Sequence, residues 1–420
     1  MTPSAARGAS LKRRARAVGG ALIRRMGLLP GGVPDGHGDD ARLASQRLDA
    51  EVIVYFADTE DGLYQLRQWY GTLEALDARR RIVVVTADSR TAAAIRAETT
   101  FEVVTVARYA TLDGLLSRSA VRLVLYVNHN PENFSMLRFA SVVHVSLLHG
   151  DSDKVVSVSN QAKAYDFSFV AGRAAVDRMA RYLPLFDAEQ RCVVVGRPQL
   201  DEALTLLAGG RPPSAGARRT VLYAPTWEGA QPSAAYGSVD GLGESIVSGL
   251  LAEPSLRVVY RPHPLTGVRL ASYGAADAAI RHRIQTAQEA EPAAGHRVSV
   301  SGDIMADMAE ADLLVCDVSA VAMDWLVTDR PLVVTTPSSR EVVTASTPLL
   351  EETPRIDATS VRDVATLVLR ELEADPHGPA RRRLAEYYLG DLRPGVAAQT
   401  FLEACDAAIE AHARASHGVS

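Results

Sequence analysis

The chain has 420 residues, which is enough for two domains of ordinary size. Hydrophobic residues make up 47% and charged residues 23% of the sequence, a balance typical of soluble globular proteins. The formal net charge of -5 argues against a general nucleic-acid-binding protein, which would carry a basic excess. The cysteines, Cys192, Cys316 and Cys405, are far apart and form no disulfide framework or metal-binding motif, so a cytoplasmic location is expected. No apolar run approaches the roughly 18 residues that a membrane span requires.

Residues 1–45 are predicted to form a basic segment that is either amphipathic or disordered. No acidic residue precedes Asp35, whereas arginine and lysine are frequent there, and apolar residues recur at helical spacing between Leu11 and Leu29. A helix of this kind would lie on an anionic membrane surface. A disordered tail remains the alternative, because Gly19 and Gly20 each weaken a helix by about 1 kcal/mol.

Residues 46–206 alternate short apolar runs with amphipathic stretches. Strands that are apolar on both faces and separated by helices indicate a parallel sheet covered on both sides, as in a Rossmann-like domain. The predicted strands are Glu51–Phe56, Arg81–Thr86, Phe101–Val106, Val121–Val127, Val142–Leu148 and Arg191–Val195. The predicted helices are Leu63–Leu76, Thr91–Glu98, Leu112–Ser117, Phe134–Phe139 and Ala174–Leu183.

The same alternation restarts in residues 220–390, after a stretch at 207–219 that is dense in glycine, proline and arginine and is predicted to be a linker. A helix and tail are expected in 391–420. The fold class is therefore predicted to be α/β, with two Rossmann-like domains facing a cleft and ligands beyond the carboxyl ends of the strands. The predicted strands are Thr220–Ala224, Leu256–Arg261, Asp312–Cys316 and Leu332–Thr335. The predicted helices are Val321–Thr328, Val361–Ala374, Gly378–Tyr387 and Gln399–Ala411.

His149 ends the fifth predicted strand and is followed by Gly150. An imidazole with a pKa near 6.5 is suited to accept a proton from an attacking hydroxyl, and Lys154 lies within reach of an anion. A histidine that only hydrogen-bonds at the strand end is the alternative.

Arg261 and His263 follow another predicted strand in the run Arg-Pro-His-Pro. A guanidinium and an imidazole on a rigid turn would stabilise a phosphate during displacement. The prolines alternatively serve only to turn the chain.

Asp317 and Ser319 precede the predicted helix Val321–Thr328. The start of a helix presents unpaired N–H groups that bind pyrophosphate, with the hydroxyl of Ser319 as an additional donor. Asp317 is better suited to a cap or to contacts with ribose hydroxyls, and simple capping is an equal alternative for this corner.

Three other strand ends are weaker candidates. Thr226 follows a strand in the run Tyr-Ala-Pro-Thr-Trp and is placed at the nucleotide, as is Arg197 in a Gly-Arg-Pro corner. His129 follows Val121–Val127 and is placed at the acceptor.

Several cofactor and catalytic motifs are missing from the sequence. There is no GxGxxG after the first predicted strand, no Walker loop, no HExxH and no GxSxG. Asp151 and Asp153 form an acidic pair of the kind that holds a divalent metal on a diphosphate, but the adjoining Lys154 would repel a cation. We therefore expect no metal and no cofactor.

Taken in chain order, these corners resemble those of the CDP-glycerol:polyglycerophosphate glycerophosphotransferases of teichoic acid synthesis, over roughly residues 140 to 400. The resemblance implies the two-domain architecture of the B-type glycosyltransferases. It also implies transfer of glycerol phosphate, or a similar polyol phosphate, from a CDP-activated donor to a lipid-linked polymer or primer, with release of CMP. By match, His149 would be the general base, Arg261 and His263 would steady the transferring phosphate, and Ser319 would hold the donor pyrophosphate beside Asp317.

Two positions depart from the pattern of the family. Asp151 stands where threonine is usual, and Ala320 stands where a second serine is usual. Ribitol phosphate or a capsule-type polyol phosphate therefore remains open as the transferred group. A nucleotide-sugar glycosyltransferase or epimerase and a non-catalytic membrane-associated scaffold are the alternative functions. If the chain is a glycerophosphotransferase, it is expected to be a peripheral protein on the inner face of the cell membrane.

Overall fold

The computed structural model describes residues 39–148, 158–201, 204–205, 218–229, 235–300, 304–337, 342 and 346–417. The chain forms two compact units, the first made of Met1–His149, Gln161–Ser168 and Leu402–Ser420, and the second of Gly150–Asn160 and Phe169–Phe401. Most of the predicted N-terminal segment 1–45 and of the predicted linker 207–219 lies outside the described residues.

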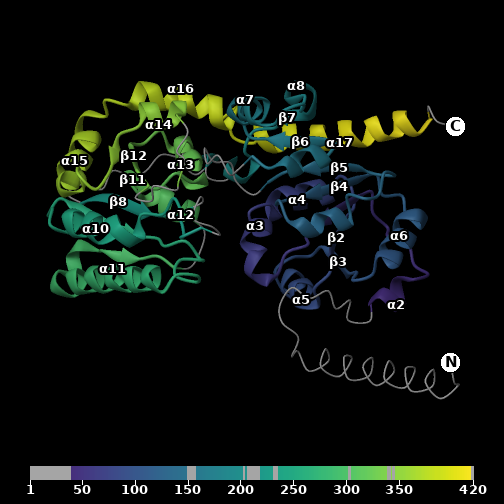
Figure 1. Ribbon diagram of the computed structural model, residues 1–420, viewed down its shortest axis with the longest axis horizontal. Coiled ribbons are helices and arrows are strands. Elements are labelled where there is room, and N and C mark those ends of the chain that lie inside the picture. The colour runs from purple at the N-terminus through teal and green to yellow at the C-terminus, as the bar shows by residue number, and fades with distance from the viewer. Residues whose placement is uncertain are drawn as a thin grey trace, which may run out of the picture. The chain divides into compact units, whose positions relative to one another are not determined.

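The first sheet has seven strands in the order β3-β2-β1-β4-β5-β6-β7, and the pairs from β3 through β6 run parallel (Figure 1). The strands β2 and β3 lie in sequence order on one side of β1, and β4 and the strands that follow it lie on the other side. We call the carboxyl ends of β1 and β4, where this order reverses, the first switch point. The strands are β1 Val52–Tyr55, β2 Ile82–Thr86, β3 Glu102–Thr105, β4 Leu123–Tyr126, β5 Val143–Ser146, β6 Phe167–Val170 and β7 Cys192–Val194.

The second sheet has six strands in the order β10-β9-β8-β11-β12-β13, all paired in parallel. This order repeats that of the first six strands of the first sheet. The second switch point is accordingly formed by the carboxyl ends of β8 and β11. The strands are β8 Arg219–Ala224, β9 Leu256–Tyr260, β10 Arg297–Val298, β11 Leu313–Cys316, β12 Leu332–Thr335 and β13 Arg355–Ile356.

Helices cover both faces of the second sheet (Figure 1). Successive residues of a strand point to opposite faces, so Val221 and Tyr223 pack against α10, α11 and α15, whereas Leu222 and Ala224 pack in the layer of α12, α13, α14 and α16. This double burial explains why the strands read as continuous apolar runs. The helices are α10 Glu244–Leu251, α11 Ala271–Ala290, α12 Ile304–Glu310, α13 Ala320–Trp325, α14 Pro348–Glu352, α15 Val364–Ala374 and α16 Gly378–Leu389.

Helices also pack against the first sheet. Apolar residues of α2 and α6 meet strand residues such as Ile53, Val83 and Tyr126 in a common core. Among the helices that the structure describes, none is long and apolar enough to cross a membrane. The bounds are α2 Asp39–Leu43, α3 Leu63–Arg67, α4 Tyr70–Asp77, α5 Ser89–Glu98, α6 Tyr109–Arg118, α7 Arg173–Tyr182 and α8 Ala188–Arg191, with α17 Val396–His417 at the C-terminus.

The predicted α/β class with two Rossmann-like halves is confirmed, and each predicted strand is present within two residues of its expected bounds. The helix predicted at Phe134–Phe139 is wrong, since a 3-10 helix at Pro131–Ser135 followed by a turn occupies this region. The side chain of Asn133 donates to the carbonyl of Asn128 and to the hydroxyl of Tyr165, which holds the backbone in this tighter form.

The helix predicted at Leu63–Leu76 is broken into α3 and α4 at Gln68 and Trp69. The indole of Trp69 is buried and donates to the carbonyl of Leu148 at 2.9 Å. A long-range contact of this kind overrides the local helical pattern.

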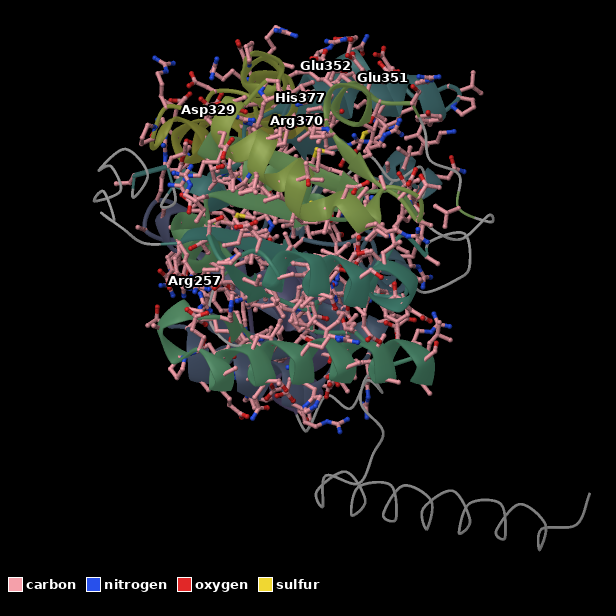
Figure 2. The ribbon with its side chains drawn as sticks, turned by 90° about the vertical axis from the view of Figure 1, so that its left-hand side faces the viewer. Arg257, Asp329, Glu351, Glu352, Arg370 and His377 are labelled. Atoms are coloured by element: carbon pink, nitrogen blue, oxygen red, sulfur yellow. The ribbon has the colours of Figure 1, made fainter. Side chains whose placement is uncertain are left out.

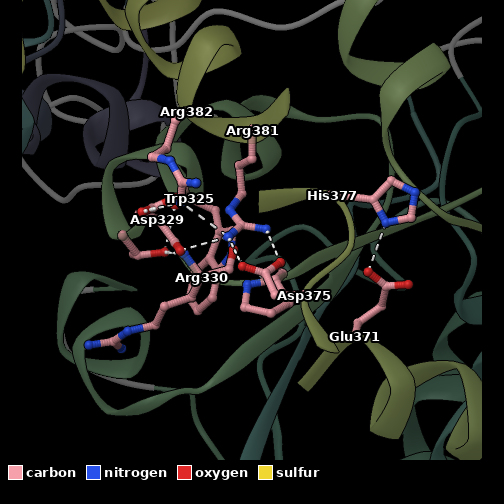
Figure 3. Close-up of polar contacts among 10 residues, drawn as sticks. Trp325, Asp329, Arg330, Glu371, Asp375, His377, Arg381 and Arg382 are labelled. Atoms are coloured by element: carbon pink, nitrogen blue, oxygen red, sulfur yellow. Dashed lines mark hydrogen bonds and ion pairs between the residues drawn. The ribbon is translucent and has the colours of Figure 1, made fainter. Parts of the chain in front are cut away.

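Polar contacts join α16 to the turn that follows α13 (Figure 3). Arg381 donates to both oxygens of Asp375, at 2.9 and 2.8 Å, and to the carbonyl of Asp329 at 2.7 Å. In the same turn, the indole of Trp325 donates to the carbonyl of Arg330 at 2.9 Å. Figure 2 shows Asp329 and His377 at the same end of the second unit, apart from Arg257.

The side chain of Arg330 points back to the end of α12. Its Nη1 donates to the carbonyls of Met308, Ala309 and Ala311 at 3.1, 2.9 and 2.6 Å. A cation at the C-terminus of a helix satisfies carbonyls that have no partner inside the helix and compensates the helix dipole. Arg330 therefore fixes the end of α12.

Replacing Arg381 with alanine is expected to lower the free energy of unfolding by about 2–3 kcal/mol, because it leaves Asp375 and a carbonyl without their partner. Arg382→Ala is the matched control: the Arg382 side chain is 58% exposed, against 5% for Arg381, and a change within about 0.5 kcal/mol is expected. Urea unfolding followed by circular dichroism measures both. Equal effects of the two substitutions would show that the Arg381 contacts do not stabilise the unit.

Candidate functional site

Asp317 lies at the centre of the second switch point. Its side chain is fully buried, and its Oδ2 accepts from the backbone N–H of Thr226 at 2.7 Å and of Ser238 at 3.1 Å. The hydroxyl of Thr335, at the end of β12, donates to Oδ1. The carboxyl group thus ties together the residues that follow β8, β11 and β12.

Burial raises the pKa of Asp317, and the hydrogen bonds from Ser238, Thr335 and Thr226 oppose that increase. The carboxyl oxygens are engaged inside the protein. The geometry therefore favours a role in positioning the Thr226 and Ser238 backbone over a direct contact with ribose hydroxyls, and the predicted donor contact of Asp317 stays a prediction.

Ser319 is the N-cap residue of α13, and Ala320 is the first residue of that helix. The side chain of Ser319 is 6% exposed and makes no capping bond, and its hydroxyl has no hydrogen-bond partner among the described residues. The capping alternative is therefore not realised by this hydroxyl. A buried hydroxyl beside the first N–H groups of a helix is suited to a bound anion.

Arg261 follows β9, the neighbour of β8. Its Nη1 donates to Asp307 Oδ2 at 2.8 Å and to Ser299 Oγ at 3.2 Å. Asp307 is buried on α12 and also accepts from Arg297 at 2.6 Å. Asp307 was missed by the sequence interpretation, because a carboxylate in the middle of a helix resembles any polar face residue.

Burial opposes the charge on Asp307, but hydrogen bonds from Ser299, Arg297 and Arg261 together hold the pKa of this carboxyl below its usual value. It therefore remains an anion at neutral pH. Its negative charge orients the guanidinium of Arg261 at the end of the strand.

His263 stacks on Trp227, with ring centroids 6.2 Å apart and an interplanar angle of 19°. Its Nδ1 accepts from the backbone N–H of Leu265 at 3.1 Å, so Nε2 carries the proton of the neutral ring. The contact joins the corner after β9 to the corner after β8. Since Thr226 joins β8 to β11, three of the predicted corners lie together at one edge of the sheet.

Glu228, which the sequence interpretation did not single out, holds the loop after His263. It is buried and accepts from the backbone N–H groups of Gly267 at 3.0 Å, Arg269 at 2.8 Å and Leu270 at 3.2 Å. Burial works against its charge, yet these backbone bonds keep the pKa of Glu228 below its usual value. The only feature of the sequence that could have pointed to Glu228 is its position directly after Thr226 and Trp227, at the end of a predicted strand.

Arg197 is buried and forms a two-pronged ion pair with Asp324 on α13, at 2.9 and 3.1 Å. This contact holds the helix whose start carries Ser319. In this arrangement Arg197 would affect the donor by positioning α13. A direct contact between Arg197 and the donor stays a prediction.

His129 belongs to the first unit and follows β4, whereas the corners described above belong to the second unit. Its ring packs on Tyr165 with centroids 5.8 Å apart. His149 and Lys154, the predicted base and anion contact, lie outside the described residues, as do Asp151 and Asp153.

No group of three or more histidine, cysteine, aspartate or glutamate side chains that could hold a metal ion occurs within the described part of the chain.

Asp307→Asn is expected to destabilise the protein by about 2–3 kcal/mol at pH 7, since the amide cannot pair with both arginines. The folded pKa of Asp307 is depressed, so its contribution is present above the unfolded pKa near 3.9 and is lost as pH falls through the folded value. The difference in melting temperature between the variant and the unmodified protein should shrink below about pH 4. A difference that stays constant from pH 7 to pH 3 would contradict the assignment.

Comparison with known proteins gives the family. The family model described as CDP-Glycerol:Poly(glycerophosphate) glycerophosphotransferase matches residues 41–345, more than half of the chain. No curated protein matches the sequence.

Solved structures share the fold. The wall teichoic acid polymerase TagF is 13% identical, with 95% of this chain and 97% of that chain covered and a TM-score of 0.54. A glycosyltransferase from Rickettsia africae is 9% identical over 86% of this chain and 99% of its own, with a TM-score of 0.53. A UDP-GlcNAc 2-epimerase from Neisseria meningitidis is 9% identical over 84% of this chain and 98% of its own, with a TM-score of 0.52.

These likenesses confirm the expected B-type glycosyltransferase fold class, and the family match confirms the resemblance noted in the sequence. The chain belongs to the CDP-glycerol:poly(glycerophosphate) glycerophosphotransferase family and is an enzyme of that type.

Proposed function

We propose that the enzyme transfers glycerol phosphate, or a similar polyol phosphate, from a CDP-activated donor to a lipid-linked teichoic-acid-like polymer or primer and releases CMP. The observation that carries the proposal is the meeting of three strand-end corners at the second switch point. The Thr226–Asp317 hydrogen bond and the Trp227–His263 stack join these corners.

The chemistry of the corners is that of a phosphate site. Arg261 supplies a permanent positive charge held by Asp307, and His263 supplies a ring N–H. Ser319 supplies a hydroxyl with no partner among the described residues at the start of α13. Positive charge and donors of this kind stabilise the negative charge that develops on transferring and departing phosphates.

In the proposed reaction, the terminal hydroxyl of the acceptor loses its proton to His149. Its oxygen attacks the phosphorus that bears glycerol, the bond from that phosphorus to the bridging oxygen breaks, and CMP leaves with that oxygen. Arg261 and His263 would bear charge on the transferred phosphate, and Ser319 would contact the departing phosphate. We propose no metal or cofactor for this step.

The peripheral location is also part of the proposal. The basic residues before Asp35 would bind an anionic surface at the inner face of the cell membrane, where a lipid-linked acceptor is presented.

The test is CMP release with CDP-glycerol, CDP-ribitol and UDP-sugars as donors, with and without EDTA. CDP-glycerol or CDP-ribitol is expected to support turnover, and EDTA is expected to leave it unchanged. His149→Ala should lower turnover by about 10²–10⁴-fold, the usual effect of losing a general base. His282→Ala, at an exposed position on α11, is the matched control and should keep full activity.

Other outcomes separate the alternatives. Near-full activity of His149→Ala would remove the general-base role. Turnover of UDP-sugars in place of CDP-polyols would favour a nucleotide-sugar enzyme, and no CMP from any donor and acceptor pair would favour the scaffold.

A further inference from the structure

The first switch point has the same topology as the second, but its polar groups differ. In parallel α/β sheets, ligands bind outside the carboxyl ends of the strands where the strand order reverses. In the first sheet this place lies between β1 and β4. Asp58 follows β1, and Asn128 and His129 follow β4.

Asn128 bridges the two strand ends. It is 4% exposed, and its Nδ2 donates to Gln65 Oε1 at 2.7 Å and to Asp58 Oδ2 at 3.3 Å. An ionised carboxylate only accepts hydrogen bonds, so Asp58 fixes the amide with its nitrogen toward the carboxylate. The oxygen Oδ1 is thereby turned away, and it is buried without a partner among the described residues.

His129 adds two more unpartnered atoms. Both of its ring nitrogens are buried and lack a hydrogen-bond partner among the described residues, although the ring packs on Tyr165. Burial lowers the pKa of His129 to about 4, so the ring is neutral at pH 7 and offers one donor and one acceptor.

Unpartnered buried atoms reduce stability, so a cluster of them requires an explanation. Within six residues the oxygens of Asn128 and Asn133 and both nitrogens of His129 lack partners among the described residues. At the second switch point, by contrast, the carboxyl group of Asp317 accepts hydrogen bonds on both of its oxygens. Polar groups left unsatisfied at a ligand-binding position of the fold are typical of a site that is completed by its ligand.

The chemistry of the cluster selects hydroxyl groups. An amide oxygen accepts from a hydroxyl, and a neutral imidazole both accepts from one and donates to another. The carboxylate of Asp58 would repel a phosphate placed beside it. The cluster therefore suits an uncharged polyol end.

We propose that the first switch point binds the hydroxyl-bearing end of the acceptor, through Oδ1 of Asn128 and the ring nitrogens of His129. The proposal rests on the proposed function and names the part of the acceptor that this unit recognises. The phosphates of the acceptor lie outside the cluster.

The test is direct binding, which requires no turnover. Calorimetry compares a synthetic glycerol phosphate trimer that ends in a free diol with the same trimer whose terminal hydroxyls are methylated. The unmodified enzyme is expected to bind the free diol roughly tenfold more tightly, because methylation removes the donors that the buried acceptors need.

Two variants assign the preference to the cluster. His129→Phe keeps the ring on Tyr165 but removes the nitrogens, and Asn128→Leu removes the amide. Both should lose the preference for the free diol. His129→Phe should keep or raise the melting temperature, since the deleted atoms have no protein partner among the described residues. Gln68→Leu, exposed at the end of α3, is the control for position and should retain the preference.

Equal binding of both trimers by the unmodified enzyme, or a full preference in His129→Phe, would overturn the proposal and leave the cluster as a site for ordered water only. If the enzyme releases no CMP but shows the preference, the hydroxyl site stands and the transfer reaction fails. If it releases CMP but shows no preference, the transfer reaction stands and this inference fails.

Discussion

A carboxyl group removed from water must have its oxygens bonded, and this requirement organises the second switch point. Asp317 meets it with backbone N–H groups of Thr226 and Ser238 and with the hydroxyl of Thr335. These partners follow or end different strands, so their positions are coupled through one buried group. The Trp227–His263 stack extends the coupling to β9. The positions of the phosphate-binding candidates therefore depend on a residue that need not touch the substrate.

Most of the fold could be predicted because a parallel sheet buried on both faces has a simple sequence pattern, in which continuous apolar strands are separated by amphipathic helices. Three strands in the described part of the chain were not predicted: β10 and β13, since Arg297–Val298 and Arg355–Ile356 are only two residues long, and the four-residue β6. The break at Trp69 depends on a carbonyl 79 positions away, and the 3-10 helix at Pro131–Ser135 depends on the contact of Asn133 with Tyr165, 32 positions away. Contacts distant in sequence are invisible to local periodicity.

The candidate site was predicted less completely, for the same reason. Arg261, His263 and Ser319 could be proposed as candidates because strand ends are functional positions in this fold class. Asp307 and Glu228 could not be assigned, since their partners are a guanidinium 46 positions away and backbone groups 39 to 42 positions away. For Arg197, the sequence predicted a donor contact; the structure shows an ion pair with Asp324, and the donor contact stays a prediction. A charged residue at a strand end does not reveal whether it faces a ligand or another helix.

The hydrogen bonds of Arg330 mean that substitutions far from the candidate site can change the position of its residues. Arg330 holds the last carbonyls of α12, α12 carries Asp307, and Asp307 orients Arg261. A genetic screen for inactive alleles would then recover substitutions in the turn after α13, where no substrate is touched. Such alleles would form a class of their own, with the phosphate-binding residues intact in sequence and misaligned in space.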